Sequence, residues 1–497
     1  MINWAEHLPA LQVVVPMLCA PLVVLLHPRG FAWAAATLAS LFALVISISL
    51  AAGLLSGHSY QYNMGSWAPP FGIELRVDAF SALMLLIVTG ASTITLLAAR
   101  KSIDQQIEEE RQPLFYAAWL LALSGLVGIL VAADAFNIFV FMEIAALSSY
   151  VMVAGGPDRR ALPAVFKYLI MGTIGATFYL IGIGMIYLMT GTLNLADMEL
   201  KIHEVADQKP VLAAAGFITI GLALKAAVFP LHIWLPNAYT YAPHMVTAFL
   251  AACSTKVSLY VLLRLDFFVF QANLSGHDIQ FSYFLMPLAV LAMLVASASA
   301  MFEQNLKRMF AYSSVAQVGY IMLGASLVNQ AGLTASIIHM FNHALAKGAL
   351  FLVVASLAMR FSGLRLSDIS GAGRQMPWTM AAFVVSGLSL IGVPGTAGFI
   401  SKWYFISAVL NEGAIGVALA VIIVASSLMA VVYVWRVVET AYFGVPQVGA
   451  IKISEAPLSI IIIIWIAALA NVYFGLVTYV PVTLGTMATE ALMGHLR

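Results

Sequence analysis

The sequence predicts an all-α polytopic membrane protein with about fourteen transmembrane helices. Of its 497 residues, 62% are hydrophobic and only 9% are charged, whereas an ordinary soluble domain has roughly 25% charged residues. Runs of about 20 apolar residues recur along the whole chain, and each is long enough to cross about 30 Å of hydrocarbon. The sequence lacks the alternating segments of about 10 residues that are typical of a membrane β-barrel.

The apolar runs define the expected spans, which are separated by short linkers. The longest polar linkers are 55–76 and 190–210, and neither is long enough to form a soluble domain. In chain order, the spans are expected at 9–26, 31–54, 77–99, 114–132, 134–154, 165–189, 211–230, 245–265, 283–302, 309–325, 335–359, 377–399, 413–435 and 457–480.

The lysines and arginines predict which side each loop faces. Of the 23 in the chain, fourteen, from Arg29 to Lys452, fall in loops on one side, and five, from Arg76 to Arg497, fall on the other. Because cytoplasmic loops carry the excess of positive charge, we expect both termini on the outer, periplasmic side of a bacterial inner membrane. The start, MINWAEHLPALQ, lacks the basic segment and cleavage site of a signal peptide, so we expect a retained first helix.

The sequence contains no cofactor motif. Cys19 and Cys253 lie in apolar runs without metal-ligand spacing, and we expect both to be packing residues outside any disulfide. There is no GxGxxG, no phosphate-binding GxxxxGK loop and no cluster of iron–sulfur cysteines. We therefore expect neither a cofactor nor a metal.

Four lysines remain at membrane depth: Lys225, Lys256, Lys347 and Lys402. A lysine at the bilayer centre costs roughly 2.5–3.5 kcal/mol on insertion scales, so buried charges of this kind usually mark an ion or proton pathway. A lysine near a helix end can instead extend its side chain to the interface, and this alternative applies most to Lys402. Lys256 and Lys347 lie in the middle of their spans, where that escape is difficult.

Glu143, in FNIFVFMEIAALSSY, is the acidic residue that we place well inside a span. It is the expected partner of a buried lysine, and we predict a functional carboxylate. A carboxyl kept neutral by burial, or an ion pair that only holds helices together, is the alternative. Asp78, Asp134, Glu412 and Glu439 fall near span ends, where we expect them at the interface.

A row of ionisable residues occupies the eleventh expected span, in SIIHMFNHALAKGAL. His339, His343 and Lys347 are four residues apart, so they share one helix face. Histidine titrates near neutral pH, which suits a proton relay. A metal site is the alternative, but no carboxylate or cysteine completes a ligand set nearby.

Prolines predict two broken helices, each beside one of the buried lysines. Pro230 and Pro236 follow Lys225 in the seventh span, and Pro394, in GVPGTAGF, precedes Lys402 in the twelfth. Irregular backbone is tolerated at membrane depth only where it faces protein or a hydrated cavity. Paired interruptions in two halves of a chain are typical of inverted repeats in ion transporters, although membrane helices also contain proline and glycine for packing alone.

Taken together, these segments resemble the proton-pumping, antiporter-like membrane subunits shared by respiratory complex I and the Mrp-type multisubunit cation/proton antiporters. The segment YNMGSWAPPFGIELRVDAFSALML is similar to that of the Mrp D-type subunits. PNAY after HIWLP departs from the acidic PDA of many complex I relatives, which favours the antiporter group. The other matching segments follow the family's order: FNIFVFMEIAALSSY, KAAVFPLHIWLPNAY, TKVSLYVLLR, KRMFAYSSVAQVGYI, HMFNHALAKGALFL and IGVPGTAGFISKW.

The resemblance implies a role for each candidate residue. Glu143 is similar to the carboxylate of the fifth helix, and Lys225 is similar to its partner in the broken seventh helix. Lys256 is similar to the lysine of the eighth helix. His339, His343 and Lys347 are similar to the relay on the eleventh helix. Lys402 is similar to the terminal lysine of the broken twelfth helix, where some relatives carry glutamate.

The resemblance also implies a division of the chain. Residues 114–265 and 283–435 would form two inverted five-helix repeats, helices 4–8 and 9–13. Residues 1–113 would contribute three peripheral N-terminal helices, and residues 436–497 would contribute helix 14.

The implied function is that of a proton-translocating membrane subunit of a multisubunit Na⁺/H⁺ antiporter, a secondary ion transporter subunit and not an enzyme. Its expected partners are other membrane subunits, H⁺, Na⁺ and the lipid bilayer, with no nucleic acid. The alternative is an ion-pumping, non-redox subunit of a complex I-like NADH/quinone oxidoreductase or membrane-bound hydrogenase. A structural membrane scaffold belongs to a different class and needs no row of buried lysines.

Overall fold

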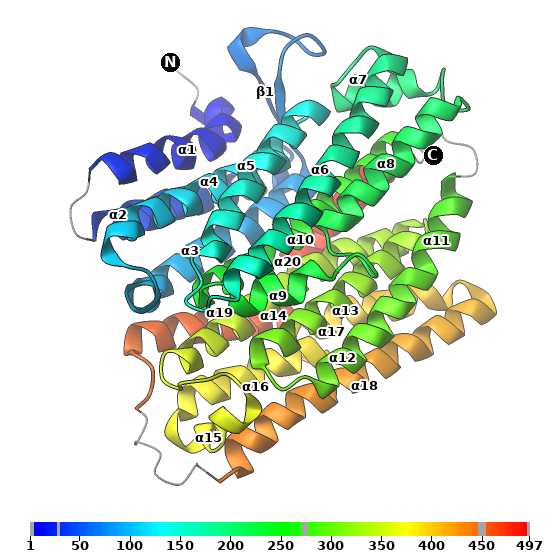
Figure 1. The fold of residues 1–497 in the computed structure, drawn as a ribbon. Coiled ribbons are helices and arrows are strands. Elements are labelled where there is room, and N and C mark those ends of the chain that lie inside the picture. Colours follow the sequence, from blue (N-terminus) through cyan, green and yellow to red (C-terminus); the bar gives the residue numbers. More distant parts are fainter. Residues whose placement is uncertain (1–3, 27–29, 271–276, 446–453, 495–497) are drawn as a thin grey trace.

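The computed structural model describes residues 4–26, 30–270, 277–445 and 454–494. Long helices run beside one another through the molecule, and a short hairpin projects at one face (Figure 1). This arrangement confirms the all-α polytopic class. Arg29, Lys452 and Arg497, which contribute to the predicted orientation, lie outside the described residues.

The first half of the chain contains the hairpin, strands β1 (Tyr60–Asn63) and β2 (Glu74–Val77), which pair antiparallel with Tyr60 opposite Val77. This hairpin forms within the linker that the sequence analysis treated as a polar loop. The helices of this half are α1 (Leu8–Leu25), α2 (Phe31–Leu55), α3 (Ala79–Gln106), α4 (Gln112–Val131), α5 (Ala135–Ala154), α6 (Ala161–Thr190), α7 (Leu195–Ile202), α8 (Lys209–Lys225), α9 (Trp234–Tyr241) and α10 (His244–Arg264).

In the second half, a π-helical segment, 292–296, joins α11 to α12, so that they form one span. The helices of this half are α11 (His277–Leu291), α12 (Ser297–Phe302), α13 (Leu306–Ser326), α14 (Gln330–Ala358), α15 (Ala372–Gln375), α16 (Pro377–Ile391), α17 (Ala397–Leu410), α18 (Gly413–Phe443), α19 (Leu458–Leu476) and α20 (Tyr479–Met493).

The predicted spans correspond to helices of the structure. Among the described residues, eleven helical segments are long and apolar enough to cross a membrane. The other three expected spans are α13, which carries polar residues such as Ser313 and Gln317, and the two interrupted ones, α8–α9 and α16–α17. The spans that contain α4, α10 and α14 are the most enclosed among the described residues, with 89% of the apolar window of each buried, so the core lies around these three helices.

Helix α20, which extends the last span beyond its expected end at residue 480, was not predicted from the sequence. Phe474 of α19 packs against Phe341 of α14 with ring centroids 5.0 Å apart, and Thr489 of α20 accepts a hydrogen bond from Thr334 of the same helix. α19 and α20 therefore both pack against α14. α20 was missed because its threonines and Glu490 lower the hydropathy of the segment.

Both expected interruptions are present. α8 ends at Lys225 and α9 begins at Trp234, with Pro230 in the segment between them. Pro236 is the third residue of α9, within the first turn, where backbone N–H groups have no intrahelical partner to lose. α16 ends at Ile391, and the following glycine, Gly392, has a φ of +89°, in the left-handed region that favours glycine.

One local arrangement occurs in both halves. Asp134 caps α5 and forms a β-bridge with Asn194 after α6, and Asn305 caps α13 and forms a β-bridge with Arg365 after α14. The helix pair α5–α6 and the helix pair α13–α14 are therefore each framed by a β-bridge between the residue that caps the first helix and a residue that follows the second. This recurrence accords with the expected five-helix repeats, whose boundaries stay a prediction.

Candidate proton pathway

Glu143 and Lys225 form an ion pair between α5 and the end of α8. Lys225 Nζ lies 2.9 Å from Glu143 Oε1, and 7% of the lysine side chain and 27% of the glutamate side chain are exposed. The carboxylate is therefore partly open, whereas the ammonium is enclosed. The expected pairing of these two residues is present in the structure.

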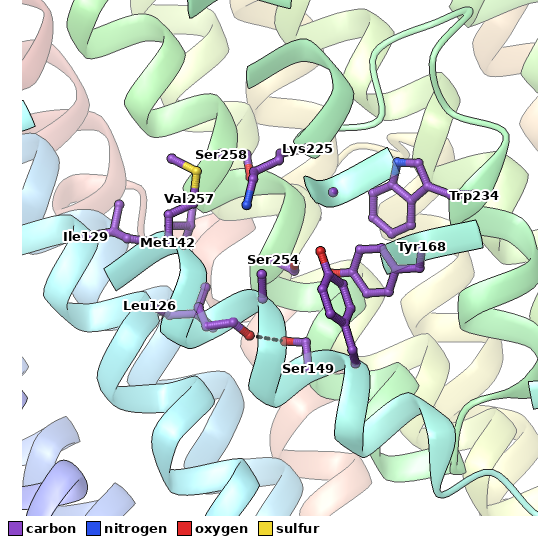
Figure 2. A pocket seen from close by; sticks show the side chains of 14 residues that line it. Leu126, Ile129, Met142, Ser149, Tyr168, Lys225, Trp234, Ser254, Val257 and Ser258 are labelled. Atoms are coloured by element: carbon purple, nitrogen blue, oxygen red, sulfur yellow. Dashed lines mark hydrogen bonds between the residues drawn. The ribbon is translucent and has the colours of Figure 1, made fainter. Parts of the chain in front are cut away.

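A small cavity of about 40 Å³ lies beside this pair. It is large enough for a water molecule, whose centre needs only about 10–15 Å³ of free space. Lys225, Tyr168 and the α10 serines Ser254 and Ser258 contribute to its wall (Figure 2). The cavity thus places polar groups of α10 next to the lysine.

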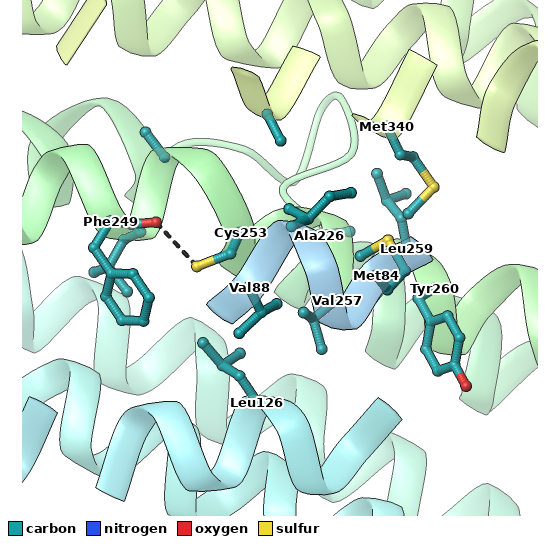
Figure 3. Close-up of a cluster of buried hydrophobic side chains, with 14 of the residues drawn as sticks. Met84, Val88, Leu126, Ala226, Phe249, Cys253, Val257, Leu259, Tyr260 and Met340 are labelled. Atoms are coloured by element: carbon teal, nitrogen blue, oxygen red, sulfur yellow. Dashed lines mark hydrogen bonds between the residues drawn. The ribbon is translucent and has the colours of Figure 1, made fainter. Parts of the chain in front are cut away.

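Lys256 lies near the middle of α10 and is fully buried. Its Nζ donates to the carbonyl of Ala251 on the same helix. Apolar side chains such as Met84 of α3, Leu126 of α4 and Met340 of α14 surround this part of α10 (Figure 3). Lys256 is thus a cation site in the apolar core between the two halves. Cys253, one turn away, is a free thiol packed in the same cluster.

His339, His343 and Lys347 all lie buried on α14. The two imidazole rings stack with centroids 5.9 Å apart. His339 Nδ1 lies 2.8 Å from Ser401 Oγ and Nε2 lies 3.0 Å from Gln317 Oε1. Among the described residues, neither nitrogen of His343 has a hydrogen-bond partner, and such buried groups usually bind ordered water.

Lys347 and Lys402 bind neutral oxygens. Lys347 Nζ donates to the carbonyl of Phe310 at 2.8 Å and to Ser313 Oγ at 2.7 Å. Lys402 Nζ donates to the carbonyl of Ile391 at 2.7 Å and to Ser427 Oγ at 2.9 Å. Since Lys402 is only 5% exposed and its ammonium turns toward α16 and α18, the interfacial alternative is not observed.

The candidate residues are close enough to influence one another electrostatically along the row. Lys256 interacts with His339, His343 and Lys347 of α14, and His339 also interacts with Lys402. The cavity beside Lys225 reaches α10 through Ser254 and Ser258. The structure therefore brings all seven predicted residues into the central layer formed by α5, α8, α10, α14 and α17.

Several further buried charged residues were not predicted from the sequence, among them Lys307, Arg264 and Asp266. Lys307, assigned to a loop, is 2% exposed, and its Nζ donates to the carbonyl of Ala242 at 2.6 Å. Arg264 pairs with Asp78 at 2.8 Å and is 9% exposed. Asp266 is 2% exposed and is therefore more buried than Glu143, whose side chain is 27% exposed. These residues lie at helix ends in the sequence, and no sequence signal shows that neighbouring helices cover them.

The other acids near span ends form local hydrogen bonds or are exposed, and their place at the interface stays a prediction. Asp134 caps α5 through the backbone N–H of Asn137, and Glu412 accepts a hydrogen bond from Asn329 at 2.7 Å. Glu439 is exposed. Among the described residues, no group of three His, Cys, Asp or Glu side chains could hold a metal ion.

The fold and this buried row define an antiporter-like membrane subunit. Residues 132–430 match the NADH:quinone oxidoreductase/Mrp antiporter transmembrane family, and the chain belongs to that family. The resemblance seen in the sequence is thereby confirmed.

Relatives include chains of both branches. The N-type NADH-quinone oxidoreductase subunit of Desulforudis audaxviator is 42% identical over 453 residues, 89% of this chain and 88% of the relative. The D-type Na⁺/H⁺ antiporter subunit of Alkalihalophilus pseudofirmus is 31% identical over 383 residues, 76% of each chain. Two kinds of multisubunit assembly are thus represented among similar chains.

Solved structures share the fold. A chain of the membrane-bound sulfane sulfur reductase, an archaeal respiratory membrane complex, matches with a TM-score of 0.89 and 29% identity, over 98% of this chain and 97% of that one. A chain of the Mrp complex from Dietzia matches with a TM-score of 0.90 and 24% identity, over 99% and 98%. At that identity, the second match shows the fold alone.

Proposed function

We propose that this chain is the proton-translocating subunit of a multisubunit Na⁺/H⁺ antiporter. Protons pass along the row from the Glu143–Lys225 pair through Lys256 and α14 to Lys402. One observation carries the proposal: the ionisable side chains form a row through the core that begins and ends at an interrupted helix. The name of the D-type antiporter relatives supports the choice of Na⁺ as the exchanged cation.

Electrostatic coupling supplies the mechanism. Two opposite unit charges about 4 Å apart attract by about 4 kcal/mol at an effective dielectric constant of 20, and like charges repel equally. A proton on Lys225 is attracted by Glu143, while a proton on Lys256 disfavours further charge on α14. Opening the Glu143–Lys225 pair therefore changes which group of the row holds the proton.

Partner subunits are expected at the interrupted helices. Pro230 and Pro394 are exposed on the surface of this chain, and irregular backbone does not face lipid at membrane depth. Protein from neighbouring subunits would cover these two segments. The relatives named above are themselves subunits of larger complexes, which supports the same expectation.

A second candidate function has its own support. The 42% identity with the N-type subunit of an NADH-quinone oxidoreductase favours an ion-pumping, non-redox subunit of a complex I-like enzyme or of a membrane-bound hydrogenase. The same buried row would serve either role, because redox chemistry would then take place in other chains.

Purification with its natural partners separates the two candidates. The chain, expressed with its neighbouring genes, would be purified, and the bound proteins identified by mass spectrometry. The complex would then be reconstituted in liposomes carrying a Na⁺ gradient. We expect small antiporter subunits and Na⁺-driven proton movement without any redox substrate. Flavin or iron–sulfur partners, with proton movement only after a redox substrate is added, would instead establish the second candidate.

A further inference from the structure

A buried serine and tyrosine stand behind Lys347. Lys347 Nζ donates to Ser313 Oγ at 2.7 Å, and Ser313 Oγ lies 2.9 Å from the hydroxyl oxygen of Tyr433. All three residues are fully buried. The lysine of α14 is thus connected through α13 to α18 by hydroxyl groups.

The same combination stands behind Lys402. Lys402 Nζ donates to Ser427 Oγ at 2.9 Å, and Ser427 Oγ lies 3.2 Å from the hydroxyl oxygen of Tyr320. The hydroxyl groups of Ser427 and Tyr320 can also each donate to the carbonyl oxygen of Ile423, at a distance of 3.0 Å. Here α18 gives the serine and α13 the tyrosine, so the two helices exchange the roles that they have at Lys347.

The chemistry of these partners distinguishes hydroxyls from carbonyls. An ammonium has three N–H donors and no acceptor, whereas the neutral amine has two donors and one lone pair. A carbonyl can only accept a hydrogen bond, but a serine or tyrosine hydroxyl can accept and donate. Lys402 has two carbonyl partners, Leu390 and Ile391, and one hydroxyl partner, which matches the needs of both protonation states.

We propose that the pairs Ser313–Tyr433 and Ser427–Tyr320 are positioning residues that reverse their hydrogen bonds when the adjacent lysine gains or loses its proton. With the ammonium, the lysine donates to the serine and the serine hydrogen turns away from it. With the neutral amine, the serine hydrogen turns to the lysine Nζ and the tyrosine donates to the serine. No heavy atom needs to move, and the transferred proton leaves along the row. This inference rests on the proposed proton pathway.

The surroundings of the two lysines fit this role. Among the described residues, no acidic side chain forms an ion pair with Lys347 or Lys402. Apart from the tyrosines of the two pairs, the titratable groups facing Lys347 are Lys256 of α10 and His343 of its own helix, and His339 of α14 faces Lys402. Since these neighbours are all basic, the neutral oxygens must stabilise each lysine.

Arg264 provides a comparison, because it also lies beside a serine and a tyrosine but always carries its charge. Arg264 lies 3.4 Å from Ser81 Oγ, which lies 2.9 Å from the hydroxyl of Tyr260. Arginine does not deprotonate in proteins, and here Asp78 binds the guanidinium. The hydroxyl pairs beside the lysines differ because they have no such counter-ion.

The test measures cation/proton exchange by the whole complex in everted membrane vesicles. Ser313→Ala removes the reversible partner of Lys347 and is expected to lower exchange about tenfold, as loss of a hydrogen bond to a charged group would. Ser313→Thr keeps the hydroxyl and should stay within about twofold of the natural chain. Tyr179→Phe is the matched control, because Tyr179 is equally buried but donates to the carbonyl of Ala135.

A double-variant cycle separates a joint role from packing. Because residues that act as one unit are not additive, Ser313→Ala combined with Tyr433→Phe should lose no more exchange than Ser313→Ala alone. Exchange at the natural rate in Ser313→Ala, or a Thr variant as slow as the Ala variant, would overturn the inference. If Ser313→Ala fails to assemble, Ser427→Ala with Tyr320→Phe provides the same test at Lys402.

The outcome also separates this inference from the proposed function. A natural complex that moves protons only with a redox substrate overturns the antiporter function, and the same variants are then compared by redox-driven proton movement. If the natural complex exchanges cations and every serine variant exchanges them at the same rate as the natural complex, only the inference about the hydroxyl pairs is overturned.

Discussion

Lys225 and Lys402 each lie beside an interrupted helix, but their ammonium groups are stabilised in different ways. Lys225 is the last residue of α8 and pairs with Glu143 at 2.9 Å. Lys402 lies in α17 and donates back across the interruption to the carbonyls of Leu390 and Ile391, at the end of α16. The end of a helix carries about half a negative charge, so α16 itself supplies the counter-charge for Lys402.

The two interruptions also differ in what their terminal carbonyls bind. At the end of α8, the carbonyl of Leu224 already accepts the indole N–H of Trp234 at 3.0 Å. Lys225 pairs with a carboxylate, which as an anion can only accept hydrogen bonds. The first half thus provides a charged pair that favours the ammonium, whereas the second half provides oxygens that can accommodate a neutral lysine as well.

The largest effect is expected from Glu143→Gln, which removes the charge of the pair and keeps its shape. Removing one partner of a buried pair costs roughly 3–5 kcal/mol. Because 27% of the Glu143 side chain is exposed, we expect the lower end of that range and a fall in exchange of roughly a hundredfold. Glu439→Gln, on the exposed surface of α18, is the control and should exchange normally. Proton movement would be followed by a pH-sensitive dye in everted vesicles, and assembly by co-purification. A Gln variant that assembles and exchanges at the natural rate would contradict the pairing role.

A loss no larger than that of Glu143→Gln, at the low end of the roughly 10²–10⁴-fold typical of a proton-transferring group, is expected from His339→Ala and Lys347→Ala in the second half. Both residues lie buried on one face of α14, and His339 and Lys347 both interact with Lys256. Groups in one relay act as a unit, so the double variant should lose far less than the product of the single losses. The same exchange assay measures all three variants. Strictly multiplicative losses would indicate independent packing roles.

The sequence predicted the partner of Lys225 better than the partners of Lys402. Glu143, Lys225 and Pro230 are unusual in apolar segments, so the residues indicated a buried carboxylate and a lysine beside a broken helix, and the family resemblance implied that the two form a pair. The partners of Lys402 could not be predicted, because main-chain carbonyls are present at every residue and only the turn at Gly392 aims two of them at the lysine.

The buried residues that were missed have a similar explanation. Lys307 is the second residue of α13, a position that is usually exposed, and it is buried because α9 ends against it at Ala242. α20 was missed because it packs against α3 and α14 through threonine and small residues. Both outcomes depend on contacts between distant segments, which local hydropathy does not encode.

Gly392→Ala tests whether the turn of the second half positions Lys402, with an expected loss of several-fold. A Cβ at Gly392 would lie 2.7 Å from Lys402 Cδ, in a residue whose φ is +89°. Gly395→Ala is the matched control, since its φ is +88° but nothing lies within 4 Å of a Cβ there. Both variants bear the cost of the left-handed conformation, about 1–2 kcal/mol. Equal exchange by the two variants would show that backbone strain alone matters and that the contact with Lys402 does not.

The last prediction concerns orientation and should leave exchange unchanged. If the halves are inverted, the matching segments after α6 and α14 lie on opposite sides of the membrane. Single cysteines would be introduced at the exposed positions Lys201, Glu490, Arg159 and Arg374, in a chain without Cys19 and Cys253. A membrane-impermeant thiol reagent should label positions 201 and 490 in intact cells, and positions 159 and 374 only after permeabilisation.

The described ends of the chain make this labelling a test of the termini as well. The ring of His7 lies 5.5 Å from Tyr62 of the hairpin, and Glu490 lines one cavity with Glu74 of the same hairpin. Both described ends therefore lie at the hairpin face, so the label at position 490 reports the side of both. Since cytoplasmic loops carry the excess of lysine and arginine, that side should be the periplasm. Labelling of positions 201 and 374 from the same side would contradict the inversion, and Lys225 and Lys402 would then not be equivalent positions of two opposed halves.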